Sequence, residues 1–150
     1  MTIEIVNQQK AMKVPEAKIR ALLRHVMAEE LGYEVNISVA VVTDARIAEL
    51  NEAFLNHVGA TDVLAFPFGE KEASTESEAV FGEIVISAER AMEEAQRRNV
   101  SPEIELLLYA VHGMLHLVGY DDASITQRRE MRQREAEVLR SLSTKNKDGS

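Results

Sequence analysis

One apolar segment constrains the fold of this chain more than any other feature. It runs from Leu106 to Val118 and is interrupted only by His112, Gly113 and His116. A helix needs about 20 apolar residues to cross a bilayer, so this run is too short to be a membrane span. Because the segment is apolar on nearly every face, it predicts a helix that is packed on most sides at the centre of the fold.

The residues around this segment mark the ends of the helix. Ser101 is a favourable N-cap, Pro102 suits a first helical turn, and Gly119 is a typical stop. We therefore expect a central buried helix from Pro102 to Val118.

Hydrophobic periodicity predicts the remaining elements. Alternation of apolar and polar residues indicates strands at 2–7 and 36–42, and the segments 62–68 and 80–86 are expected to form two more strands. Helical spacing and capping residues indicate further helices at 15–31, 44–58, 88–98 and from 124 onward. The order βαβαββααα favours an α+β fold, with a small mixed four-stranded sheet flanked by about five helices.

Length and composition set the broad class of the protein. The 150 residues suit a single domain, which we expect at 1–143, followed by a disordered tail at 144–150. The start of the chain has no basic region followed by a long apolar stretch, so a cytoplasmic location and no membrane partner are expected. The net charge of −8 disfavours indiscriminate nucleic-acid binding, although a local basic stripe can still bind phosphates.

Two histidines on the central helix are the strongest candidates for chemistry. There is no cysteine, so a metal would have to rest on histidines and carboxylates. His112 and His116 are four residues apart and project from one face of the helix. After the helix stops, the chain can bring Asp122 back as a third ligand, with Asp121 as a competitor. The alternative is a pair of core histidines satisfied by backbone carbonyls.

Three ligands with an open fourth position are typical of a catalytic zinc site. A bound dication lowers the pKa of water from about 15.7 toward about 7, which would supply the nucleophile of a hydrolase. Gly113 stands where a metalloprotease of the HExxH type has its general-base glutamate, so peptidase activity is disfavoured. Two histidines and a carboxylate also match non-haem iron sites, so the ligand set alone does not exclude iron as the bound metal.

Several motifs resemble one known family. The segment 112–121, His-Gly-Met-Leu-His-Leu-Val-Gly-Tyr-Asp, resembles the signature HGxLHLxGYDH of the YbeY family of bacterial endoribonucleases. The segments 50–51, 61–67 and 82–87 are similar to the LN, TDVLSFP and GDIVIS blocks of that family. The resemblance implies an α+β fold, one Zn²⁺ per chain, and action on ribosomal RNA precursors with the small ribosomal subunit or its assembly factors as partners.

The chain departs from the family pattern at three positions. Asp122 stands where the family has its third ligand histidine, and its negative charge should make the metal a weaker Lewis acid. Leu55 replaces an arginine that could steady a scissile phosphate. Ala65 replaces a serine on the strand expected at the active site.

Three further residues are candidates for contact with substrate. His57 precedes the segment 61–67. Arg128 and Arg129 are the arginines of the last helix nearest the metal loop, which is the turn from Gly119 to Asp122. Acidic residues are interspersed with those arginines, so a solvated, salt-bridged helix face is the competing interpretation.

The leading hypothesis is a zinc-dependent endoribonuclease that cleaves single strands in rRNA maturation and ribosome biogenesis. Metal-activated water would attack the phosphodiester, with His112 and His116 as the catalytic metal ligands. The alternative is a ribosome-assembly or RNA-binding factor whose metal site is structural or vestigial, which the three departures favour. Hydrolysis of a peptide or small amide is a third possibility.

Overall fold

The computed structural model describes residues 2–55, 59, 61–68 and 80–149, with side chains up to 142. The elements follow one another as expected, and their bounds are β1 (Ile3–Asn7), α1 (Glu16–Val26), η1 (Met27–Leu31), β2 (Asn36–Val42), α2 (Asp44–Leu55), β3 (Val63–Pro67), β4 (Val80–Ser87), α4 (Ala88–Arg98), α5 (Pro102–Leu117) and α6 (Ile125–Gly149). Within this part of the chain, no helix is both long and apolar enough to traverse a lipid bilayer.

The four strands form one mixed sheet in the order β1-β2-β4-β3, which confirms the predicted α+β class. β1, β2 and β4 are parallel, whereas β3 is antiparallel to β4 and forms one edge. β4 lies between two strands and carries buried side chains on both faces, so its nearly continuous apolar sequence suits an inner position.

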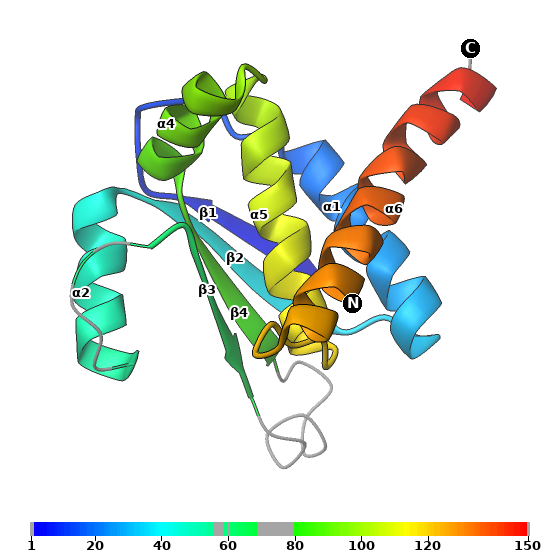
Figure 1. Cartoon of the computed structure of the whole chain (residues 1–150), viewed down its shortest axis with the longest axis horizontal. Coiled ribbons are helices and arrows are strands. Elements are labelled where there is room, and N and C mark those ends of the chain that lie inside the picture. The colour runs from blue at the N-terminus through cyan, green and yellow to red at the C-terminus, as the bar shows by residue number, and fades with distance from the viewer. Residues whose placement is uncertain (1, 56–58, 60, 69–79, 150) are drawn as a thin grey trace.

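Helices cover the sheet unequally (Figure 1). The larger core lies between one face of the sheet and helices α1, α5 and α6, and it includes alternate residues of β2 such as Val39 and Val41. The intervening residues, among them Val42, face a smaller cluster with Ile47 of α2. Alternate side chains along β2 therefore pack into two hydrophobic cores of different size, one on each face of the sheet.

Helix α5 approaches the sheet unusually closely. A Cβ atom added at Gly113 would lie 2.7 Å from a side-chain carbon of Ile84 on β4, and one added at Gly82 would lie 2.8 Å from Leu117. Two glycines, one on each element, thus permit the contact. The same contact fixes where His112 and His116 lie relative to the sheet.

Two regions differ in detail from the sequence expectations. The first helix ends its α-helical part at Val26 and continues as a wider π-helical turn, η1, which stops at Gly32 with a φ of 79°. At the C-terminus, α6 continues to Gly149, whereas a disordered tail was expected at 144–150; the disorder stays a prediction, as does the single domain at 1–143. The polar segment 69–78, between the third and fourth expected strands, is predicted by the sequence to form a loop and lies outside the described residues.

The close packing of α5 predicts that a glycine-to-alanine substitution in this helix destabilises the protein, although such substitutions usually stabilise helices. Glycine to alanine in a helix normally stabilises by about 0.5 to 1 kcal/mol. Gly113→Ala should instead lower the free energy of unfolding by about 1 to 3 kcal/mol, because the new methyl group forces α5 away from Ile84. Urea denaturation measures the change, and a variant as stable as the parent would contradict the close approach.

Candidate metal centre

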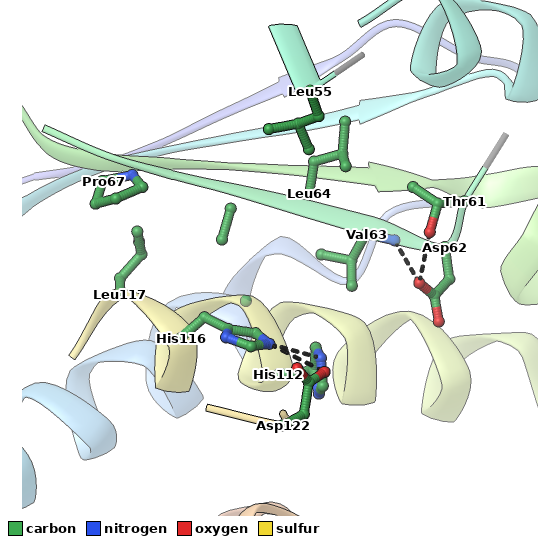
Figure 2. Close-up of a pocket in the computed structure, with 12 residues that line it drawn as sticks. Leu55, Thr61, Asp62, Val63, Leu64, Pro67, His112, His116, Leu117 and Asp122 are labelled. Atoms are coloured by element: carbon green, nitrogen blue, oxygen red, sulfur yellow. Dashed lines mark hydrogen bonds and ion pairs between the residues drawn. The ribbon is translucent and has the colours of Figure 1, made fainter. Parts of the chain in front are cut away.

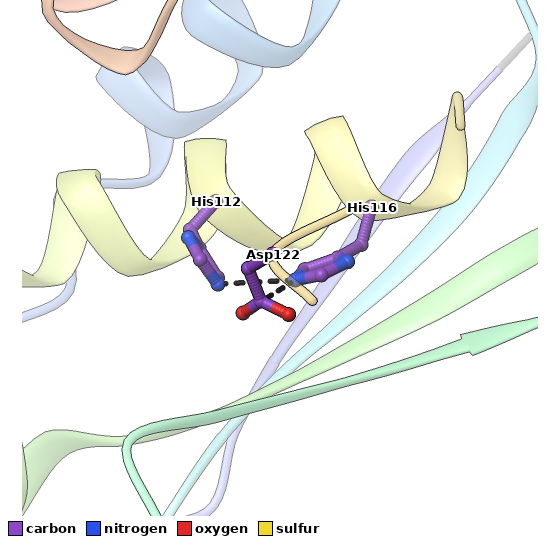
Figure 3. A group of neighbouring side chains, drawn as sticks. All are labelled: His112, His116 and Asp122. Atoms are coloured by element: carbon purple, nitrogen blue, oxygen red, sulfur yellow. Dashed lines mark hydrogen bonds and ion pairs between the residues drawn. The ribbon is translucent and has the colours of Figure 1, made fainter. Parts of the chain in front are cut away.

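The two histidines predicted as ligands lie side by side on one face of α5 (Figure 3). The helix begins as expected, because the Ser101 side chain accepts a hydrogen bond from the backbone N–H of Ile104 and Pro102 occupies the first turn. The Nε2 atoms of His112 and His116 are 3.2 Å apart. Both side chains are 28% exposed, so the rings are not enclosed in the core.

The loop after α5 brings an aspartate to these rings. Gly119 adopts a φ of 114°, a left-handed conformation that favours glycine, and this turns the chain back on itself. Oδ2 of Asp122 then lies 3.6 Å from Nε2 of His116. The carboxylate of Asp121 instead accepts a hydrogen bond from the backbone N–H of Asp122, at 2.8 Å.

The spacing of these groups suits a metal ion. One ligand atom from each of His112, His116 and Asp122 lies within 4.8 Å of the others. A tetrahedral zinc ion about 2.0 to 2.1 Å from two nitrogens would hold them about 3.3 to 3.4 Å apart, close to the observed separation of the two Nε2 atoms. The donor set and its geometry therefore fit a dication without rearrangement of α5.

A carboxylate on α6 orients the first histidine. Oε2 of Glu135 lies 2.5 Å from Nδ1 of His112, and Glu135 is only 8% exposed. Burial lowers the pKa of His112, but the hydrogen bond and negative charge of Glu135 outweigh that effect and raise the pKa overall. This contact keeps a proton on Nδ1 and leaves the Nε2 lone pair for a metal, as carboxylates behind metal-binding histidines commonly do.

Sequence reasoning assigned no role in the site to Glu135, although a signal was present. Met131, Glu135 and Val138 follow helical spacing, and all three are buried against the core. A glutamate at an apolar position of an amphipathic helix needs a partner, since an unpaired buried charge is costly. That pattern could have linked α6 to one of the histidines of α5.

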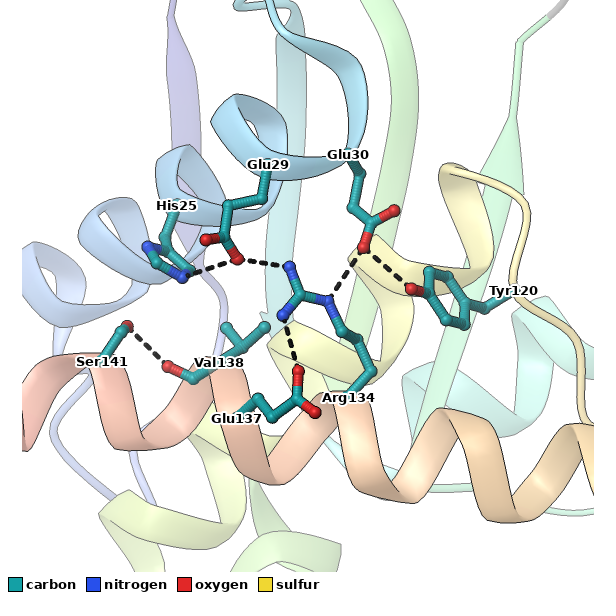
Figure 4. Close-up of polar contacts among 8 residues, drawn as sticks. All are labelled: His25, Glu29, Glu30, Tyr120, Arg134, Glu137, Val138 and Ser141. Carbon is teal, nitrogen blue, oxygen red and sulfur yellow. Dashed lines mark hydrogen bonds and ion pairs between the residues drawn. The ribbon is translucent and has the colours of Figure 1, made fainter.

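A second network ties α6 to the metal loop (Figure 4). Nε of Arg134 donates to Glu30 of η1 at 2.8 Å, and the hydroxyl of Tyr120 donates to the same carboxylate at 2.8 Å. Arg134 also pairs with Glu29 and Glu137. Since Tyr120 lies in the loop that carries Asp122, this network holds the loop against η1 and α6.

The three groups border an open cleft of about 410 Å³ between α5 and β3 (Figure 2). Asp62 lines the cleft and is oriented by hydrogen bonds from the Thr61 hydroxyl and the Val63 backbone N–H. Leu55 and Ala65, two of the three departures from the family pattern, line it as well. No lysine or arginine is found among its described lining residues, so the cleft wall has no cation of its own there.

The three residues predicted to contact substrate differ in their position relative to the metal centre. Arg128 lies beside the centre, where it lines a small cavity with His112 and Asp122 and donates to the Asp122 carbonyl at 3.1 Å. Arg129 is exposed and lines neither that cavity nor the cleft. His57 lies outside the described residues. All three stay predictions as substrate contacts.

Comparison with known proteins identifies relatives of this chain in sequence and in fold. The family model for endoribonuclease YbeY matches residues 4–143. Curated relatives with that name include one from Micrococcus luteus, 39% identical over 87% of this chain and 85% of the relative, and one from Chlorobium phaeovibrioides, 37% identical over 95% and 91%. The solution structure of TM1509 from Thermotoga maritima aligns with a TM-score of 0.64 at 30% identity, covering 99% of this chain and 97% of the other.

Fold and site define the class of an α+β protein with a group of two histidines and one aspartate that could hold a metal ion. More particularly, the chain belongs to the endoribonuclease YbeY family.

The contact between Glu135 and His112 predicts that the protein binds metal less tightly when the charge of Glu135 is removed. Glu135→Gln should weaken zinc binding about tenfold or more. Without the Glu135 carboxylate, the His112 ring is held less firmly and its Nε2 atom is a less basic ligand. Competition with a fluorescent chelator measures the affinity. Glu130→Gln, on the exposed surface of the same helix, is the matched control and should bind as the parent does. Equal affinities for all three proteins would refute a role for Glu135 at the metal.

Proposed function

We propose that this protein is a zinc-dependent endoribonuclease that cleaves single-stranded RNA during the maturation of ribosomal RNA in the cytoplasm. The observation that carries the proposal is the meeting of two imidazoles and a carboxylate at the border of an open cleft, in a chain that belongs to the endoribonuclease YbeY family. Its substrate would be RNA precursors of the ribosome, and its partners the small subunit or its assembly factors.

Zinc is the proposed metal because the donor set and the short spacing of the ligand atoms suit tetrahedral coordination. His112, His116 and Asp122 would hold the ion. When bound, zinc supplies Lewis acidity, which makes a water molecule nucleophilic at neutral pH and stabilises negative charge on phosphate oxygens. Iron uses similar ligands, and metal analysis separates the two.

The side chains of this protein have distinct roles in the proposed reaction. Glu135 keeps the proton on Nδ1 of His112, so that Nε2 faces the cleft as a ligand. Asp62, held by two hydrogen bonds, offers an acceptor to a hydroxyl of the substrate in the same cleft. Asp122 contributes a negative charge where the family pattern has a neutral imidazole, which reduces the Lewis acidity of the ion.

A second function has one specific observation in its favour. Leu55 and Ala65 line the cleft where the family pattern has an arginine and a serine, and no lysine or arginine is among the described residues that line the cleft itself. Such a cleft would bind a scissile phosphate less firmly. The alternative is a ribosome-assembly factor that binds RNA or the small subunit with a structural or vestigial metal site.

Cleavage assays with single-stranded fragments of ribosomal RNA precursors test the leading proposal. Cleavage should cease in a chelator and return with zinc, and His116→Ala should reduce the rate by about 100-fold or more because one of three ligands is lost. Arg46→Ala is the control, since Arg46 pairs with Glu49 on the surface of α2 and lines no part of the cleft.

The same variants distinguish the two functions. An assembly factor with a vestigial metal site should bind small-subunit particles equally well before and after His116→Ala, provided that circular dichroism shows a folded protein. Absence of any chelator-sensitive cleavage by the parent protein, together with retained binding, would overturn the nuclease in favour of the assembly factor.

A further inference from the structure

A second polar cavity adjoins the cleft at the start of β3. Its volume is about 270 Å³, and it shares Thr61 and Asp62 with the cleft. The remaining wall comes from α4 and α5, which pack against each other (Figure 1). The cavity and the cleft are therefore neighbours that meet at Thr61 and Asp62.

Helix α5 carries both sites on one face. Glu105 and Tyr109 line the cavity, whereas His112 and His116 line the cleft. These four positions follow helical spacing of four, three and four residues, so they form a single polar stripe along an otherwise apolar helix. Tyr109 lies about 4.5 Å along the helix axis from His112, less than one turn.

Two hydrogen-bond donors of residues that line the cavity make no hydrogen bond among the described residues. Tyr109 is 5% exposed, and its hydroxyl has no hydrogen-bond partner among the described residues. Nε of Arg90 is also buried and, within the same part of the chain, unpartnered. Buried donors of this kind are uncommon, because a buried polar group left without a partner loses its hydrogen bonds to water and gains none in return. Burial raises the pKa of Tyr109 most, and the charges of Glu105 and Asp62 and the closeness of the Glu105 carboxylate to the hydroxyl raise it further, so the hydroxyl stays a donor at neutral pH.

Acceptors lie beside these donors. Glu105 pairs with Arg98 at 3.3 Å, and Glu94 pairs with Arg97 at 2.8 Å. Each carboxylate still has lone pairs available after one ion pair. With Asp62, three carboxylates and two arginines line the cavity, so its charge is unfavourable for a phosphate group. The lining suits a neutral ligand that presents acceptors and donors close together.

We propose that this cavity binds one nucleobase of the RNA whose backbone lies in the adjoining cleft, and that it prefers guanine. Guanine presents O6 and N7 to an arginine fork and offers N1–H and N2–H to carboxylates. Arg90 and Tyr109 supply the donors, and Glu94 and Glu105 supply the acceptors. The cavity is slightly smaller than the range of about 300 Å³ and above that is usual for drug-sized ligands, as suits a single base. The inference rests on RNA as the substrate of the cleft.

Binding of short RNAs tests the cavity separately from cleavage. The probes are fluorescent hexamers of adenosine in which one guanosine occupies each position in turn, and anisotropy is measured in a chelator so that no cleavage occurs. The parent protein should bind at least one guanosine-containing hexamer about tenfold more tightly than the all-adenosine hexamer. The same preference should then appear as a preferred cleavage position when zinc is restored.

Two variants identify the cavity as the source of the preference. Tyr109→Phe removes only an unpartnered hydroxyl, so the fold should be retained, and Arg90→Gln removes the charged fork. Each should abolish most of the tenfold preference while zinc affinity stays unchanged. Arg24→Gln, at an exposed arginine of α1 paired with Glu34, is the control and should keep the preference.

The outcomes separate this inference from the proposed nuclease. Equal binding of all hexamers by the parent protein, or a preference that survives both cavity variants, would overturn the guanine site. A preference that depends on Tyr109 and Arg90 supports the site even if zinc restores no cleavage, in which case the nuclease proposal fails alone.

Discussion

Helix α5 packs closely on β4, and this contact sets where the metal-binding side chains lie relative to the sheet. Gly113 lets the helix lie against Ile84, and Gly82 makes room for Leu117 one turn further along. Because α5 is buried on most sides, its position is over-determined by the core. The polar face of the helix is thereby held next to the edge strand β3, and the cleft forms between them.

Helix α6 connects this core to the metal centre. One of its buried positions holds Glu135, whose charge is tolerated because it meets Nδ1 of His112. The neighbouring Arg134 donates to Glu30, which also accepts from the Tyr120 hydroxyl, and this shared carboxylate restrains the loop that carries Asp122. Two successive residues of one helix therefore support both a histidine and the loop that supplies the carboxylate, which limits how far the three ligands can separate.

Much of this architecture follows from local sequence signals. Capping residues are reliable because their side chains satisfy nearby backbone groups: Ser101 caps α5, and Ser124 and Gln127 form the reciprocal capping box before α6. Two local signals, the spacing of His112 and His116 and the glycine turn after them, also predicted that the two rings and Asp122 lie together. The structure places one ligand atom from each within 4.8 Å of the others. These features depend on residues close together in the chain.

Features that depend on distant residues were not predictable in the same way. The contact of Glu135 with His112 spans 23 positions, and its only local trace is a charge on an apolar helix face. The order of the strands, with β3 antiparallel at an edge, depends on tertiary packing. The cavity beside Tyr109 joins α4, α5 and the start of β3, and the π-helical turn after Val26 has no clear sequence marker.

Metal analysis of protein purified without added metal tests whether His112, His116 and Asp122 hold an ion. A three-ligand centre should give about one zinc per chain in the parent protein and little metal in His112→Ala, with both proteins folded. A parent protein that contains no metal and binds none when zinc is supplied, or a His112→Ala variant that retains the full amount, would contradict it.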